Sequence, residues 1–156
     1  MGRFPDRNEI KLKTLQAIEM FMQKDSELLQ NVVHERTIAA KIAHYLELKF
    51  PEWTTDIEYN KMMGKEVKEL EGIKACRKRR GTNRIYPDII VHHRGIKYDN
   101  LLVIELKKTN LNPKCDILKL RLLTSPKGEF RYHLGLFLEL KKDKTIPRWF
   151  AGGEEI

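Results

Sequence analysis

The sequence predicts an α/β fold, and three observations support this prediction. Apolar residues recur at helical spacing in three segments, while short runs of branched and aromatic residues have the length of strands. The 156 residues suffice for one domain with its own core, and no repeat or linker divides them. A content of 41% hydrophobic and 33% charged residues is typical of a folded, soluble chain. The predicted elements are, in order, helices at 8–22 and 33–49, strands at 54–62, 89–91 and 101–104, a helix at 113–123 and a strand at 132–140.

The N-terminal region, residues 1–32, is predicted to be a helical extension whose helix begins at the N-cap Asn8. The second helix, 33–49, is expected to end before Pro51, because a residue that precedes proline disfavours helical backbone. This helix opens the predicted core, residues 33–140.

Glu35 lies near the start of the second helix, on the same stripe as the apolar Ile38 and Ile42. That position predicts a carboxylate that faces the core. A glutamate in the first turn is also favoured by the helix dipole, which requires no functional role. Taken alone, the helix favours this simpler interpretation.

The strand predicted at 54–62 places Ile57 on one face and Asp56 on the other, and Asp56 is expected to face solvent. Residues 63–83 follow as a basic insertion that contains a short helix and a cationic loop. Six cations lie in and directly after this loop without one acid among them: Lys74, Arg77, Lys78, Arg79, Arg80 and Arg84.

The basic character of the chain is local. The chain has 30 Lys and Arg against 22 Asp and Glu, a net charge of +8, and removing the six loop cations leaves 24 against 22. Such a cluster favours a contact patch over a generally cationic surface. A solvated charge run or a nuclear-targeting signal would have a similar composition.

Acidic residues occur where two buried strands should be apolar. Asp88 opens the run 89–91, and Glu105 and Lys107 close the run that begins at 101–104. Because side chains alternate along a strand, Glu105 and Lys107 share one face. An unpaired carboxylate buried there would cost roughly several kcal/mol. A bound divalent cation explains two acids and a lysine that converge at one place more easily than packing does.

Pro87-Asp88 followed by Glu105-Leu106-Lys107 resembles the signature of the PD-(D/E)xK nucleases, the restriction-endonuclease-like superfamily. The resemblance implies an α-β-β-β-α-β core, a mixed central sheet flanked by helices, to which the N-terminal helix is an addition. It also implies that Asp88 and Glu105 hold Mg²⁺ or Mn²⁺ and that Lys107 lies near the nucleophilic water.

The same resemblance bears on two helices. The family places an acid on its first core helix beside the metal, so Glu35 becomes a candidate catalytic residue and metal ligand, directly or through a water. The helix at 113–123, which the N-cap Asn112 announces, carries Asp116 and Lys119 three residues apart. An exposed ion pair between them is the ordinary interpretation. The family often carries a polar or basic residue on this helix that reaches the site, which makes Lys119 a secondary candidate.

Other features of the sequence carry less information. Cys76 and Cys115 lie far apart, without the spacing of a zinc site or a disulfide framework, so a reducing, cytoplasmic location is expected. His92 and His93 are neighbours on a strand and point to opposite faces, so they are not expected to share an ion. No apolar run has membrane-spanning length, and no signal-peptide core opens the chain.

The function predicted on this basis is a metal-dependent endonuclease that hydrolyses DNA phosphodiester bonds, with RNA left open as a substrate. A nucleic-acid-binding or interaction subunit of a defence, repair or recombination complex, with the same fold and no independent cleavage, is the alternative. No membrane partner is expected, and a homodimer or a partner protein stays open. The residues expected to contact nucleic acid are Lys74, Arg77, Lys78, Arg79, Arg80, Arg84 and Lys119.

Overall fold

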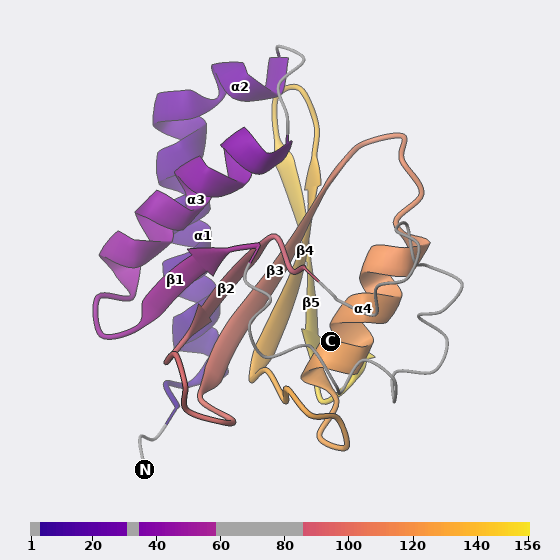
Figure 1. Cartoon of the computed structure of the whole chain (residues 1–156). Helices are drawn as coiled ribbons and strands as arrows, with labels where there is room; N and C mark the ends of the chain where they lie inside the picture. The colour runs from indigo at the N-terminus through magenta and orange to yellow at the C-terminus, as the bar shows by residue number, and fades with distance from the viewer. Residues whose placement is uncertain (1–3, 31–34, 59–85) are drawn as a thin grey trace.

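The computed structural model, which describes residues 4–30, 35–58 and 86–156, is built around one sheet of six strands (Figure 1). The strands are β1 (Thr54–Ile57), β2 (Ile89–His92), β3 (Asn100–Lys108), β4 (Leu134–Leu140), β5 (Thr145–Ala151) and β6 (Glu154–Glu155). They lie side by side in sequence order. β3 and β4 are parallel, and the other neighbouring pairs are antiparallel, which makes the sheet mixed.

Two long helices, α1 (Arg7–Asp25) and α3 (Glu35–Lys49), cover one face of the sheet, and the short α2 (Glu27–Gln30) lies beside them (Figure 1). Helix α4 (Lys114–Thr124) covers the opposite face. The structure is therefore α/β with a mixed sheet between helices, as the sequence predicts.

The N-terminal helix α1 is part of the main hydrophobic core. Its Ile10 and Phe21 are fully buried and belong to the same cluster as the apolar stripe of α3 and the strands beneath. The helix begins after Asp6, whose Oδ1 accepts a hydrogen bond from the Asn8 backbone N–H at 2.7 Å. The predicted N-cap, Asn8, is therefore wrong by two residues, because the aspartate earlier in the chain satisfies the free N–H.

Helix α4 begins one residue after its predicted start, so its N-cap is Pro113 and the predicted N-cap, Asn112, is wrong by one residue. The Asn112 side chain still accepts a hydrogen bond from the Lys114 backbone N–H at 3.0 Å, which satisfies a free N–H of the first turn. The helix approaches β4 closely at Gly135. A Cβ at this position would lie 3.0 Å from Thr124 Cγ2 and 3.4 Å from the Leu120 side chain. The glycine therefore lets α4 lie tightly on the sheet, which fixes the side chains that the helix presents to β3.

Apolar side chains on the two faces of the central strands belong to two separate hydrophobic clusters. Leu102 and Ile104 of β3 join the cluster under α1 and α3, while Val103 faces α4. In β4 the leucines face the first cluster and Phe137 faces the second. The period-two alternation thus continues through the strand on which the acidic and basic residues lie.

Several expectations need correction. Strands β5 and β6 were not predicted, although Phe150 of β5 is fully buried. Strand β1 ends at Ile57, because Glu58 is described and lies outside the strand, and the remaining predicted residues, 59–62, lie outside the described residues. Cys115 is disulfide-bonded, contrary to the prediction, and its partner lies outside the described residues. A pairing that depends on tertiary proximity leaves no signal in sequence spacing.

None of the described helices is long and apolar enough to span a membrane.

Candidate functional site

Asp88 and Glu105 meet where β2 begins and β3 nears its end. Ile89 pairs with Ile104 in the antiparallel register, so Asp88 comes level with Glu105. The Asp88 Oδ2 accepts a hydrogen bond from the Leu106 backbone N–H at 2.7 Å, which holds the aspartate against β3. The structure therefore brings together the two acids that the sequence places at strand ends.

Glu105 is a buried carboxyl group, with 1% of the residue exposed. Burial raises its pKa well above the usual range, because the charged form loses its hydration. The Lys119 ammonium opposes this rise in pKa, and the neighbouring Asp88 adds to it through like charge. Burial on the strand disfavours the ionised form of Glu105, and a nearby cation favours that form.

Lys119 supplies a positive charge to Glu105 from the opposite layer. Its Nζ lies 2.7 Å from Glu105 Oε1, and only 20% of the lysine side chain is exposed. Burial lowers the pKa of Lys119, but the charges of Glu105, Asp116 and Asp88 outweigh it and raise the pKa overall. Lys119 is thus a charged group inside the site. Its predicted contact with nucleic acid would require the ammonium group to leave Glu105.

Lys107 forms the second ion pair between β3 and α4. Its Nζ lies 2.8 Å from Asp116 Oδ2, and each side chain is 12% exposed. Burial opposes the charged form of the lysine, yet the pKa of Lys107 is raised overall by Asp116 first and by Glu35 and Glu105 after it. Lys107 is therefore held as an ammonium group.

The pairing between strand and helix is crossed. The exposed ion pair between Asp116 and Lys119, which is the ordinary interpretation of their spacing, does not form. Asp116 contacts Lys107 of β3, and Lys119 contacts Glu105 of β3. Glu105 Oε1 and Asp116 Oδ2 are buried and lack a well-aligned hydrogen-bond donor, so the two contacts are ion pairs at short distance. The sequence does not single out Asp116 as a candidate site residue, although its carboxylate pairs with Lys107 in the structure.

Glu35 lies at the same end of the sheet, on the first turn of α3. Its Oε1 accepts a hydrogen bond from the Lys108 backbone N–H at 3.2 Å. The carboxylate is half-buried and raises the pKa of Lys107, so it does not stand in open solvent on the far side of its helix. Glu35 connects α3 to the end of β3.

Within residues 4–30, 35–58 and 86–156, no three His, Cys, Asp or Glu side chains are grouped closely enough to hold a metal ion. The described donor set is the pair Asp88 and Glu105, with Glu35 nearby but outside such a group. The predicted basic patch, Lys74 to Arg84, lies outside the described residues.

A second charged cluster occupies the other end of β2. His92 is buried, and its Nε2 lies 2.7 Å from Asp56 Oδ2, while Arg94 donates to Asp56 from its Nε at 2.9 Å. Asp56 was expected to face solvent, but its side chain is only 14% exposed. The correction follows from the neighbouring strand, which brings two partners to an acid on an edge strand. His93 lies apart from this cluster, with its ring stacked on Trp53 at a centroid distance of 3.9 Å.

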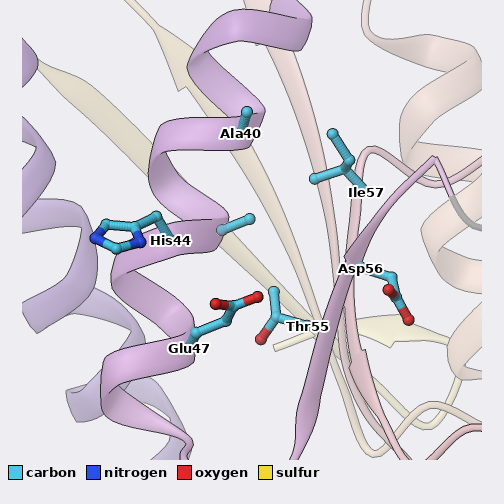
Figure 2. A pocket seen from close by; sticks show the side chains of 7 residues that line it. Ala40, His44, Glu47, Thr55, Asp56 and Ile57 are labelled. Carbon is cyan, nitrogen blue, oxygen red and sulfur yellow. The ribbon is translucent and has the colours of Figure 1, made fainter.

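The hollow shown in Figure 2 lies elsewhere, between α3 and β1, with a volume of about 320 Å³. Its lining includes Ala40 and Glu47 of α3 and Thr55 of β1. It contains none of the candidate site residues, and it is an open depression in the surface. We therefore place the chemistry at the crossed charges of β3 and α4, where buried ionisable groups are concentrated.

A scan of the sequence against protein-family models finds no match, and a search of curated proteins finds none either.

Proposed function

We propose that this protein is a metal-dependent nuclease of the PD-(D/E)xK type that hydrolyses phosphodiester bonds in DNA. The observation that carries the proposal is the meeting of Asp88 with the buried Glu105, on adjacent strands and beside Lys107. These are the residues of the motif Pro87-Asp88 and Glu105-Leu106-Lys107, and they converge although seventeen positions separate the two acids.

The order of elements supports the finer assignment of the fold. From α3 to β4 the chain runs helix, three strands, helix, strand, with β3 and β4 parallel across α4. We assign this segment to the restriction-endonuclease-like core. Helix α1 and strands β5 and β6 enlarge that core at its two ends.

The donor set fits a hard divalent cation. Mg²⁺ and Mn²⁺ bind carboxylate oxygens, and Mg²⁺ is commonly held by one or two carboxylates with waters completing its shell. Glu105 Oε1 is a buried carboxylate oxygen that lacks a well-aligned hydrogen-bond donor and has the Lys119 ammonium at 2.7 Å, so a cation already lies at the oxygen that the ion would use. Asp88 and Glu105 would hold the ion, and Glu35 would contribute directly or through a water.

In the proposed reaction, a water oxygen bonds to phosphorus and the water gives up a proton. The bond from phosphorus to the leaving oxygen breaks, and the leaving oxygen takes up a proton. A divalent cation held by Asp88 and Glu105 would lower the pKa of the water and would place a positive charge beside the phosphate. Lys107 is kept charged by Asp116, at 2.8 Å. This favours stabilisation of phosphate charge or orientation of the water over removal of a proton by the lysine.

The test is incubation of the purified protein with supercoiled, linear, single-stranded and branched DNA and with RNA, each with and without Mg²⁺ or Mn²⁺. Cleavage should require the cation and should be lost in Asp88→Asn and in Glu105→Gln, because each variant removes a charged ligand at nearly constant shape. Asp143→Asn, at an exposed position after β4, is the matched control and should cleave normally. Cation-dependent cleavage that survives in both site variants would refute the assigned site.

A binding module without cleavage is the second candidate. It is favoured by the closed charge network, in which α4 already neutralises both Glu105 and Lys107. For this candidate the same assay would show retention of DNA without product under any cation, and Asp88→Asn would bind as the wild type does.

A further inference from the structure

Lys119 has no role in the proposed chemistry so far, yet it occupies the centre of the site. Its Nζ is 2.7 Å from Glu105 Oε1, and its side chain is four-fifths buried. Lysine is rarely buried unless it is paired, because its ammonium group is strongly hydrated in water. The buried position of Lys119 is thus explained by its ion pair with Glu105.

The Lys119 ammonium and a divalent cation would compete for the same oxygen. Glu105 Oε1 is the oxygen that the ammonium contacts and also the buried oxygen that lacks an aligned donor. A divalent ion bound to that carboxylate would lie within a few ångströms of the ammonium, and like charges at such a distance in a protein interior repel strongly. The ammonium and a divalent cation would therefore compete for Glu105 Oε1.

We propose that the Lys119 ammonium is the resident counter-cation of the Asp88 and Glu105 carboxylates, and that a divalent cation binds by displacing it. The inference rests on the proposed function, since it concerns the same carboxylates. Lys119 in this role neutralises the buried acid while the protein is free of metal. Lys119 also raises the concentration of divalent cation that is needed for binding, because the incoming ion must replace an ion pair that already exists.

The released side chain keeps a negative partner within reach. Asp116 lies three residues earlier on the same face of α4 and contacts Lys107. Because the lysine has a long flexible stem, its ammonium can leave Glu105 without moving the helix. Displacement therefore requires a change of side-chain conformation only.

The decisive experiment is calorimetric titration of Ca²⁺, a hard divalent cation that binds carboxylate oxygens, into wild type and Lys119→Met at about pH 8. The Met side chain keeps the length and removes the charge. We expect Lys119→Met to bind Ca²⁺ at least about tenfold more tightly, since no ion pair has to be broken. The matched control is Lys114→Met, an exposed lysine on the same helix, which should bind as the wild type does.

Thermal melting provides a second readout on the same variants. Without metal, Lys119→Met should melt about 5 °C or more below wild type, because Glu105 loses its counter-charge. Saturating Ca²⁺ should remove most of this deficit. A merely structural lysine would give the same deficit with and without Ca²⁺, which would overturn the inference.

Labelling of wild-type lysines with an acylating reagent, read by peptide mass spectrometry, decides the matter without a substitution. Lys119 should react slowly in metal-free protein and faster in Ca²⁺, while Lys114 reacts equally in both. Ca²⁺ binding with unchanged Lys119 labelling, or with equal or weaker affinity in Lys119→Met, would overturn the displacement alone. Absence of cation binding in both wild type and variant would overturn the proposed function as well.

Discussion

The ion pair between Lys107 and Asp116 should contribute measurably to stability, and Asp116→Asn is the perturbation that tests this. The two charges are 2.8 Å apart and each side chain is 12% exposed. Removal of one partner from a fully buried pair costs about 3–5 kcal/mol, and from an exposed pair about 0–1 kcal/mol. Lys107 also keeps Glu35 and Glu105 as further negative neighbours. We therefore expect Asp116→Asn to lower the free energy of unfolding by about 2 kcal/mol.

Urea unfolding followed by tryptophan fluorescence measures this loss. With a slope of about 2 kcal/mol per molar urea, the midpoint of Asp116→Asn should fall by about 1 M. The cycle with Lys107→Met and the double variant should show a coupling energy of about 1–2 kcal/mol. The exposed pair between Glu9 and Lys13, at 3.2 Å, is the matched control, and Glu9→Gln should cost less than about 0.5 kcal/mol. Additivity of the two site substitutions within about 0.5 kcal/mol would refute the claim that this pair connects α4 to β3.

Three further predictions concern other parts of the chain. Arg94 first, and then His92, lower the pKa of Asp56 against the opposing effect of burial. The ionised Asp56 therefore stabilises the fold above its unfolded pKa, and this stabilisation is lost as pH falls through the folded pKa. Asp56→Asn should lower the free energy of unfolding by about 1–2 kcal/mol at about pH 7 and by much less near pH 3, measured by urea unfolding at each pH. Replacing the four cations at 77–80 with Ser should flatten the slope of log affinity for duplex DNA against log salt by about two to three units, measured in Ca²⁺, whereas parallel slopes would assign the run to solvent or to a protein partner. Deletion of residues 1–30 should leave a chain without a cooperative unfolding transition, because Ile10 and Phe21 are fully buried in the main core, and a cooperatively folded product would show that α1 is dispensable.

Most of the fold follows from local pattern. The branched runs of β2 and β3 and the leucines of β4 indicate buried strands, and Asn112-Pro113 predicts the start of α4 to within one residue. Strand β5 escapes prediction because Pro147 interrupts its run, and proline lacks the N–H that a strand interior uses. Its partner β6 has two residues, too few for any pattern.

Some residues of the candidate site can be predicted from the sequence, and others cannot. Asp88, Glu105 and Lys107 can be found from sequence, because charges at the ends of apolar strands conflict with their surroundings. The partners on α4 cannot be assigned so easily, since the three-residue spacing of Asp116 and Lys119 predicts only that they share a helix face. Which charge each of them meets depends on how closely α4 lies on the sheet.

The central claim is that Asp88 and Glu105 together hold a divalent cation, and Mn²⁺ located by anomalous scattering from crystals of the protein tests it most directly. We expect one strong peak within about 2–2.5 Å of a carboxylate oxygen from each residue, with the Lys119 ammonium moved away from Glu105. Crystals of Asp88→Asn grown under the same conditions should lack this peak. A Mn²⁺ peak elsewhere in the molecule, or no peak between these two residues at saturating Mn²⁺, would contradict the account.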